Sequence, residues 1–565
     1  MELFEQHFDA AFAAPDGIKK LRELILTLAM QGKLIPQDPN DLPASQLMKE
    51  IEAEKKRLVK EGKIEVPKSL STVKRIEAQY ALPKTWKWVR FGDIAQHNSG
   101  KTLDKGRNTG QLHDYITTSN LYWGHFRLEN VRQMLIRKEE LERCTARRND
   151  LLICEGGEAG RAAVWDYETD ICFQNHIHRA RFYGNINPYF SYRFFEKLNA
   201  TREIDQYRKG VGISNMSSKT LASINFPLPP LPEQHRIVAK IDQLMARCDD
   251  LEKLRTEREQ KRRSIHTAAL KQLLDVQASD KFADVWKFIT QNFSELYAVK
   301  ENVAELRKAI LQLGVMGKLV PQNPNDQPAS QLLKEIEAEK KRLVKEGKIK
   351  APKPLSTIKL EDMPYALPQG WEWVRLGYIG DFINGDRGKN YPNREEYVSE
   401  GIPWINTGHI EPDGFLTQSE MYFIRRNKFE SLNGGKIAPG DLVYCLRGAT
   451  FGKTAIVDPY SEGAIASSLM IIRPYRQCSN RYLYRYLVSP LGRSQIFKFN
   501  NGSAQPNLSS SNVQLYIFPL PPLPEQHRII AKIDQLMTLC DALEKDINNA
   551  TGKQTELLDA VMAQV

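Results

Sequence analysis

The chain has 565 residues, of which 41% are hydrophobic and 26% charged, with a net charge of +11 and a pI of about 9.0. This length exceeds what one hydrophobic core supports, so we expect two or three globular units with connectors between them. The basic excess is compatible with a polyanionic partner. Seven widely spaced cysteines without a CxxC pair argue against a disulfide framework or structural zinc, and favour a reducing compartment. The sequence has no uncharged run long enough for a membrane span and no basic, apolar leader, so the predicted location is the cytoplasm.

The first predicted element lies in a segment that the chain contains twice. Residues 32–64 recur as residues 317–349, with 29 of 33 positions identical. The stretch PASQLMKEIEAEKKRLVKEGK predicts a helix, because Leu47, Ile51 and Leu58 share one face and Glu and Lys cover the rest. Gly62 is suited to the C′ position that ends it. We expect a helical region over residues 1–80 and a second, central one over residues 228–365.

The next two segments, residues 81–227 and 366–519, share a skeleton but few side chains. LPKTWKWVRFGDIA at 82–95 matches LPQGWEWVRLGYIG at 367–380, and together the two segments hold 41 of the 51 aromatic residues. Short apolar runs such as DLLIC and DLVYC, cut by Gly and Asn, predict strands, and one amphipathic helix is expected near 187–200 and near 480–490. Each segment is therefore predicted to be an α+β (mixed α/β) domain with its own surface chemistry.

A second duplication follows each of these domains. Residues 226–245 and 518–537, both containing PLPPLPEQHRI, are identical at 19 of 20 positions. Apolar residues then recur at heptad a and d spacing, which predicts a long helix that packs lengthwise on another helix, within the central region and within the C-terminal region 520–565. The stripe residues are Ile237, Ile241, Leu244, Cys248 and Leu251 in the first copy and Ile529, Ile533, Leu536, Cys540 and Leu543 in the second.

The offset between copies is 285 residues for the first duplication and 292 for the second, so the whole chain is a tandem duplication. If the pieces at the two termini pack as the central pieces do, repeated antiparallel helical coiled-coil spacers join the two domains in a pseudo-two-fold circular arrangement. The expected fold is therefore two similar α+β domains on a repeated helical scaffold.

Several motifs invite a catalytic interpretation that their spacing does not support. RGATFGKT at 447–454 has three residues between its glycines where a P-loop needs four. NPYF at 187–190 lacks the second proline of an adenine-methyltransferase motif, and Asn187 with Pro188 suits a helix N-cap. His176 and His178 have no third ligand for a metal, and His235 and His527 have no accompanying nucleophile, so a hydrogen bond at the helix start is expected for them. No catalytic residue and no metal site are predicted.

The doubled PLPPLPEQHRI motif, with LPxxWxWVR opening each variable domain, resembles the specificity (S) subunit of Type I restriction–modification enzymes, the HsdS family. The resemblance covers essentially the whole chain. It implies a DNA-binding, non-catalytic subunit in which each variable domain is a target recognition domain for one half of a split, asymmetric site on double-stranded DNA.

The resemblance also implies partners. The repeated helices would hold the half-sites at a fixed separation and dock two methyltransferase (M) subunits, and restriction (R) subunits would join them in phage defence. No cofactor is expected on this chain: S-adenosylmethionine and adenine-N6 methylation would belong to the methyltransferase partner, ATP and Mg to the restriction partner. Two identical partners require equal docking surfaces, whereas two different half-sites leave the recognition domains free to diverge.

Both variable domains carry a modest basic excess, with 22 Lys and Arg against 16 Asp and Glu in residues 81–227, and 16 against 13 in residues 366–519. Phosphate contacts supply most affinity for DNA, and a few side chains at base edges supply discrimination. The candidates sit in the loops where the two halves differ most. In the first domain they are Lys101, Lys105, Arg107, Arg127, Arg147, Arg148, Arg161, Arg208 and Lys209, and in the second Arg387, Lys389, Arg394, Arg425, Arg426, Arg447, Lys453, Asn500 and Asn501.

Two other classes of function are weighed against this interpretation. A self-contained DNA methyltransferase or nuclease would need a cofactor loop or paired carboxylates, and the sequence offers neither. The other class is a helical assembly scaffold that does not bind DNA, and the basic loops are the only evidence against it.

Overall fold

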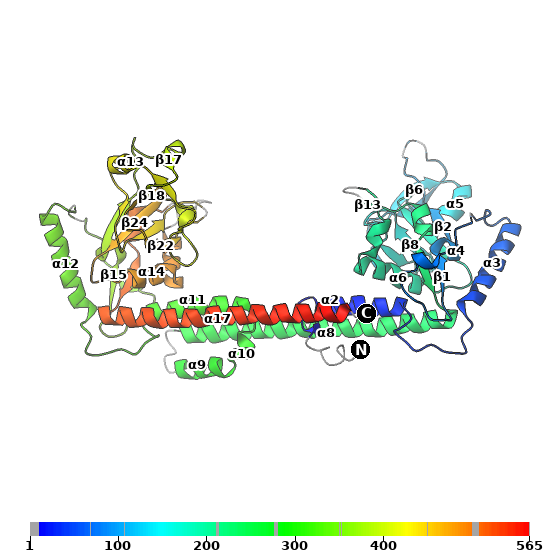
Figure 1. Cartoon of the computed structure of the whole chain (residues 1–565), viewed down its shortest axis with the longest axis horizontal. Coiled ribbons are helices and arrows are strands. Elements are labelled where there is room, and N and C mark those ends of the chain that lie inside the picture. The colour runs from blue at the N-terminus through cyan, green and yellow to red at the C-terminus, as the bar shows by residue number, and fades with distance from the viewer. Residues whose placement is uncertain are drawn as a thin grey trace. The chain divides into compact units, whose positions relative to one another are not determined.

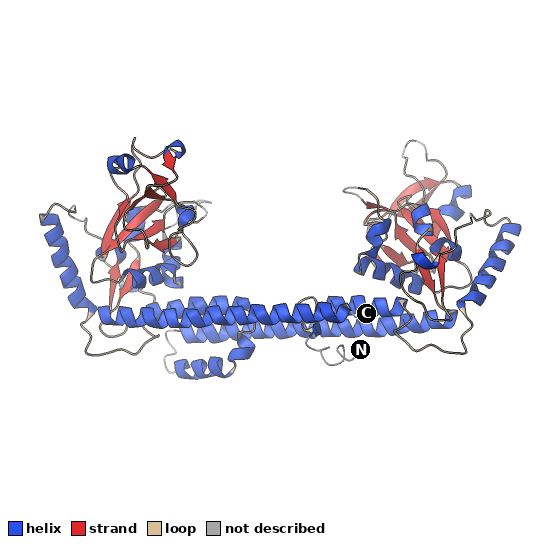
Figure 2. Ribbon diagram, in the orientation of Figure 1, coloured by secondary structure: helices blue, strands red, loops and turns tan. Residues whose placement is uncertain are grey.

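A computed structural model of the chain describes residues 11–67, 69–104, 106, 108–210, 214–275, 281–349, 351, 353–448, 450–499 and 508–563. The chain divides into two units, Met1–Arg258 with Ala550–Val565 and Glu259–Asn549, and both boundaries fall inside long helices. Strands occur only within residues 87–228 and 372–520 of the described chain, and helices make up the rest of the regular structure (Figure 2). None of the described helices has the length and apolar character that crossing a membrane would require.

Within the described residues the first unit contains the helices α2 and α3 and then the first variable domain, which we call the first recognition domain after the expectation above (Figure 1). Its elements are α2 (Gly17–Met30), α3 (Ala44–Lys60), η1 (Arg75–Glu77), β1 (Lys87–Arg90), α4 (Phe91–Ile94), β2 (Ala95–Ser99), β3 (Gln111–Ile116), β4 (Leu121–Tyr122), β5 (His125–Phe126), β6 (Arg132–Ile136), α5 (Lys138–Cys144), β7 (Thr145–Ala146), β8 (Leu151–Cys154), β9 (Gly156–Gly157), β10 (Ala162–Val164), β11 (Ile171–Phe173), β12 (Ile177–Phe182), α6 (Pro188–Ala200), η2 (Glu203–Tyr207), β13 (Ser214–Asn215), α7 (Ser218–Ala222) and β14 (Asn225–Leu228). The long helix α8 (Leu231–Leu274) follows.

The second unit has the same plan of two helices, a mixed domain and a long helix from α11 onward, with different elements inside the domain. Its elements are α9 (Phe282–Gln291), α10 (Phe293–Leu296), α11 (Lys300–Val315), α12 (Ala329–Lys345), η4 (Leu360–Asp362), β15 (Glu372–Arg375), η5 (Leu376–Tyr378), β16 (Gly380–Asn384), η6 (Arg394–Glu396), β17 (Tyr397–Val398), β18 (Ile402–Ile405), η7 (Thr407–His409), β19 (Tyr422–Ile424), α13 (Arg426–Ser431), β20 (Lys436–Ile437), β21 (Leu442–Cys445), β22 (Thr454–Ile456), β23 (Gly463–Ile465), β24 (Leu469–Pro474), α14 (Asn480–Val488), α15 (Pro490–Lys498), α16 (Ser510–Gln514) and β25 (Ile517–Leu520). The long helix α17 (Leu523–Met562) follows.

Each recognition domain is built around a four-stranded antiparallel sheet. The order is β10-β8-β12-β2 in the first domain and β16-β24-β21-β22 in the second, which is the same arrangement of equivalent strands. A second sheet, β6-β3-β11-β7 or β17-β19-β18-β23-β20, accompanies it. The strands β8 and β21 are buried along their whole length, in line with their continuous apolar runs. The predicted α+β fold, shared by two divergent domains, is confirmed.

A separate two-stranded ladder joins the beginning of each domain to its end. The WVR run of β1 pairs with β14, and the WVR run of β15 pairs with β25, immediately before the long helix begins. The entry to the domain and the exit into the helix are thus fixed side by side in both copies.

The heptad stripe packs on a helix that precedes the domain in the same unit. Ile237, Ile241 and Cys248 of α8 share a core with α2, while Leu244 packs partly buried against it. Ile529, Ile533 and Cys540 of α17 share a core with α11, joined by Leu536 and Leu543. The helices α2 and α11, which the sequence interpretation did not single out, are therefore the partners of the predicted stripe.

One stripe residue differs from the expectation. Leu251 is 49% exposed, whereas Leu543 of the second copy packs against the core. The guanidinium of Arg255, the next stripe position, donates to the carbonyl of Ala14 at 3.1 Å. A polar contact thus replaces apolar packing at this part of α8, and the predicted inclusion of Leu251 in the packed stripe is wrong.

Equivalent pieces complete the scaffold of each unit. In the first unit Leu558 and Val561 of α17 share a small core with Ala11, Phe12 and Leu24 near the N-terminus. In the second, Leu270 and Leu273 of α8 belong to the core that also contains Val285 and Leu296. The prediction that the terminal pieces pack as the central pieces do is confirmed within each unit.

Candidate nucleic-acid interface

A polar latch built from the duplicated motifs attaches each recognition domain to its long helix. The carboxylate of Glu233 is 1% exposed and accepts hydrogen bonds from Trp86 Nε1 at 2.9 Å and from Gln37 Nε2 at 2.6 Å. Burial raises the pKa of Glu233, against the opposite effect of these two bonds. The latch thus joins the PQ of one repeat, the first Trp of WxWV and the Glu of PEQHR, so the three motifs recur together because they contact one another.

The second unit contains the same latch with nearly the same distances. Glu525 accepts from Trp371 Nε1 at 3.0 Å and from Gln322 Nε2 at 2.7 Å. Arg236 pairs with Asp41 at 2.5 Å, and Arg528 pairs with Asp326 at 2.6 Å. These contacts explain why the loop PQxPND and the motif PEQHR are duplicated almost without change.

The next residue of the motif contacts the amphipathic helix of the recognition domain. Gln234 Oε1 accepts from the backbone N–H of Asn187 at 2.9 Å, and Asn187 caps α6 by accepting from Tyr189 N. His235 Nδ1 lies 3.1 Å from Asn187 Nδ2. In the second unit Gln526 Oε1 accepts from Ser479 N at 2.8 Å. The expected N-cap at Asn187 and the expected hydrogen bond of His235 at a helix start are confirmed.

In the second domain, several loops leave the four-stranded sheet at the same end of its strands. In the register, Asn384 at the end of β16 faces Met470, and Cys445 at the end of β21 faces Leu469. The loop after β16, the turn between β21 and β22 and the start of β24 therefore meet at the same edge. We call this edge the open edge of the domain.

Four of the candidate cations lie at the open edge of the second domain. Arg387 and Lys389 follow β16, while Arg447 and Lys453 occupy the turn between β21 and β22. Arg387, Lys389 and Arg447 are exposed and Lys453 is half-buried. Within the part of the chain that the structure describes, none of the four forms an ion pair, so their charge is available to a polyanion.

The equivalent edge of the first domain is more fully neutralised. Lys101 pairs with Glu140 at 2.6 Å, Arg161 with Glu158 at 3.1 Å, and Arg208 with Asp205 at 2.8 Å. Hydrogen bonds from Arg137 and then Lys101 lower the pKa of Glu140 to about 2. Lys209 is exposed and pairs with no acid among the described residues.

An aromatic stack lies beside this edge in the first domain. The ring of Tyr122 stacks on His125 with centroids 5.3 Å apart, and the guanidinium of Arg127 lies 4.3 Å from its centre. Arg161 approaches the same ring at 5.5 Å. A pocket of about 830 Å³ opens there between Tyr122, Arg127 and Arg132. Tyr122 and Arg132 were not among the sequence candidates, because their role depends on neighbours that only the fold supplies.

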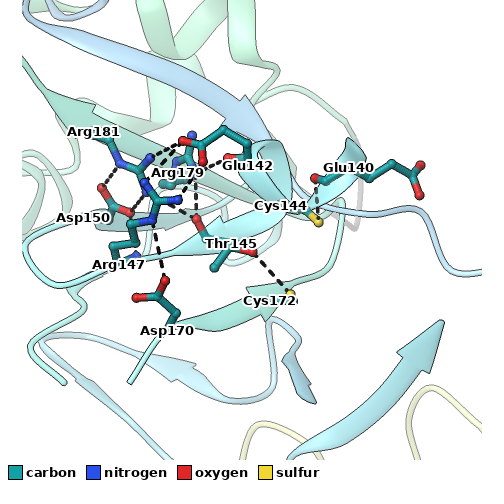
Figure 3. A network of polar contacts seen from close by, with 10 residues as sticks. All are labelled: Glu140, Glu142, Cys144, Thr145, Arg147, Asp150, Asp170, Cys172, Arg179 and Arg181. Carbon is teal, nitrogen blue, oxygen red and sulfur yellow. Dashed lines mark hydrogen bonds and ion pairs between the residues drawn. The ribbon is translucent and has the colours of Figure 1, made fainter. Parts of the chain in front are cut away.

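Another candidate, Arg147, belongs to an ion-pair network at the opposite end of the sheet, together with Arg181, which was not a candidate (Figure 3). Arg147 pairs with Glu142 at 2.6 Å, and Arg181 pairs with Asp150 at 2.7 Å and with Glu142 at 3.1 Å. In the second domain Arg473 pairs with Asp441 at 2.8 Å in the equivalent place. This shared ion pair indicates a structural role for the network.

Arg148 also lies near the start of β8 and pairs with Asp166 and Glu168. In the second domain Arg425 is the N-cap residue of α13, Arg426 begins that helix and pairs with Glu462 at 2.6 Å, and Arg394 begins η6. Lys105, Arg107, Asn500 and Asn501 lie outside the described residues.

The pairing pattern reverses what the charge counts indicate. The first domain has the larger basic excess by count, but acids bind most of its candidate cations. The second domain has the smaller excess, and its open edge keeps four cations without an acid among the described residues. Counting charges therefore did not identify which of the described cations are free of an acid.

The arrangement defines a class of protein: two related recognition domains, each latched identically to a long helix and each with its own set of polar and basic side chains at a common edge. A family model, the Type I restriction modification DNA specificity domain, matches residues 83–260 and again residues 368–551.

Relatives match along nearly the whole chain. The specificity subunit of the Type I restriction enzyme EcoAI from Escherichia coli is 33% identical over 558 residues, which cover 96% of this chain and 93% of the relative. That of EcoEI from Escherichia coli is 30% identical over 572 residues, with the same coverage. The solved HsdS subunit from Thermoanaerobacter tengcongensis is 18% identical, with a TM-score of 0.45 over 86% of this chain and 98% of that one. The chain belongs to the specificity subunits of Type I restriction–modification systems, which are non-catalytic components of these enzymes.

Proposed function

We propose that each recognition domain reads one half of a bipartite, asymmetric site on double-stranded DNA through its open edge. The observation that carries the proposal is the contrast between an identical latch and a different set of side chains at the same edge. The first domain offers Arg161, Lys209 and the Tyr122–Arg127 stack, and the second offers Arg387, Arg447 and their neighbours. Different side chains on one fold suit two different half-sites, since discrimination depends on a few side chains at base edges.

The repeated helical scaffold is proposed to dock two methyltransferase subunits, which supply S-adenosylmethionine and adenine-N6 methylation, and restriction subunits that use ATP and Mg. Target adenines are stacked in the duplex, so the methyltransferase must flip them out while the recognition domains hold the DNA. The helix α8 has 44 residues, or about 66 Å at 1.5 Å per residue. Two helical turns of B-DNA are about 68 Å, so a helix of this length is compatible with holding half-sites at a fixed separation.

Arg447→Ala tests the assignment of the open edge. Removing one phosphate-contacting cation should lower the slope of log affinity against log salt by about one on a random-sequence duplex. Arg476→Ala is the matched control, because Arg476 is an exposed arginine of the same domain that follows β24 at the opposite end of the sheet. Fluorescence anisotropy over a salt series measures both variants.

The methyltransferase complex of each variant is measured in parallel by co-purification. The proposal requires that Arg447→Ala weakens DNA binding and leaves the partner bound. Equal loss of DNA and partner would show that the edge is misplaced. An unchanged salt slope would favour the scaffold that does not touch DNA.

A further inference from the structure

The duplicated segment 32–64 and 317–349 consists of a loop and a helix, and the sequence identity of each part has a different explanation. Its loop is held by the latch, because Gln37 and Asp41 bond Glu233 and Arg236, and Gln322 and Asp326 do the same in the other unit. Its helix, α3 or α12, is identical at 16 of 17 positions. The latch does not account for the identity of that helix.

The inward face of the helix is explained by packing. Leu47 and Ile51 of α3 are 6% and 0% exposed, and Leu332 and Ile336 of α12 are 3% and 2% exposed. Both helices end in the same way: Gly62 has φ +66° and Gly347 has φ +68°, the left-handed conformation of a C′ glycine. The predicted face and the predicted stop at Gly62 are thus confirmed.

The outward face is equally identical although it is exposed. We call its middle line the crown: Lys49, Ala53, Lys56 and Lys60 of α3, and Lys334, Ala338, Lys341 and Lys345 of α12. All eight residues are exposed, and a spacing of four, three and four residues places each set along one side of its helix. Folding places little constraint on such positions, since surface substitutions usually change stability by only about 0.5 kcal/mol.

A neighbouring helix pair shows how far exposed positions have drifted since the duplication. The helices α2 and α11 agree at five of 14 equivalent positions. Four of these are packed leucines or isoleucines, and the fifth is the arginine that pairs with the long helix as Arg22 or Arg307. Elsewhere charges have even exchanged places: Lys20 pairs with Glu23 in α2, whereas Glu305 pairs with Lys308 in α11.

We propose that the two crowns are docking surfaces for two copies of one acidic protein partner, one copy on each unit. The inference rests on the proposed function, in which the partner present in two copies is the methyltransferase subunit. One chain binding at both places demands the same surface twice, which accounts for identity on the exposed side of the helix.

The chemistry of the crown favours a protein over DNA. Three lysines lie along each helix, so the complementary surface is acidic. Phosphate contacts would tolerate exchange of Lys and Arg, whereas the same residue stands at each of these positions in both copies. Ala53 and Ala338 leave a gap in the lysine row, where a neighbouring helix or loop can approach the backbone closely.

The test uses the full chain co-expressed with its methyltransferase subunit, and native mass spectrometry counts the copies bound. Ala53→Trp and Ala338→Trp each place a large ring in one crown at an exposed position, so each variant should bind one copy. The double variant should bind none. Lys56→Glu and Lys341→Glu provide an independent pair, with affinity for the affected copy weakened about tenfold or more.

Lys19→Glu is the matched control, since Lys19 is exposed on the adjacent helix α2 and its counterpart in the second copy is Ala304. It should keep both copies, and every variant should keep the salt-dependent DNA binding of the unmodified chain. Two bound copies on the double tryptophan variant would overturn the crown assignment while leaving the proposed function intact. An unmodified chain that binds no methyltransferase subunit would overturn the proposed function and the inference with it.

Discussion

Individual residues explain why the chain repeats certain motifs almost without change. Glu233 accepts two hydrogen bonds from donors more than 140 positions away in the sequence, and Glu525 does the same in the second unit. A carboxylate fits this role because it presents two acceptor oxygens and no donor. The two latches therefore leave little freedom to change at Glu, at Gln or at Trp.

Glu233→Gln should lower the free energy of unfolding by about 1–3 kcal/mol, because the new amide places an N–H against the N–H of Trp86 or of Gln37. Urea unfolding followed by tryptophan fluorescence measures this loss. Glu257→Gln on the exposed surface of α8 is the control and should change stability by less than about 0.5 kcal/mol. If both variants unfolded alike, the latch would contribute nothing measurable.

Residue-level predictions from the sequence succeeded where the interaction is local. The N-cap at Asn187, the C′ glycine at Gly62 and the inward face of α3 all depend on neighbours within a few positions. Predictions about available charge failed to separate the candidates, because Lys101 and Arg148 pair with Glu140 of α5 and with Asp166, which are distant in the sequence and meet them only in the folded domain.

At the scale of elements, the heptad stripe predicted a helix on a helix, and the structure supplies the partner. Ile533 is fully buried against α11, where the backbone comes so close that a Cβ on Gly314 would lie 2.9 Å from Ile533 Cδ1. The partner helices α2 and α11 share only five of 14 positions, so repetition did not mark them in the sequence.

Ile533→Ala should destabilise the second unit by about 2–5 kcal/mol, since it removes buried methyl groups and leaves a cavity between α17 and α11. Leu539→Ala on the same helix is the control, because Leu539 is 60% exposed. Thermal unfolding followed by circular dichroism distinguishes the two. A loss at Leu539 as large as that at Ile533 would mean that the stripe does not define the packed face.

For the whole molecule, duplication separates what must be the same from what must differ. The latch, the crown and the first part of each long helix are preserved, while the open edges and the later parts of α8 and α17 have diverged. The sequence predicted this division of labour from the pattern of identity. It could not predict which of the described cations pair with an acid, because pairing depends on tertiary contacts.

The central claim is that two different readers on one scaffold direct one methylation reaction. The most direct measurement is single-molecule methylome sequencing of cells that express this chain with its methyltransferase subunit. The account predicts one split, asymmetric motif with a methylated adenine on each strand. A contiguous or palindromic motif, or the absence of any motif despite a stable complex with the methyltransferase, would contradict it.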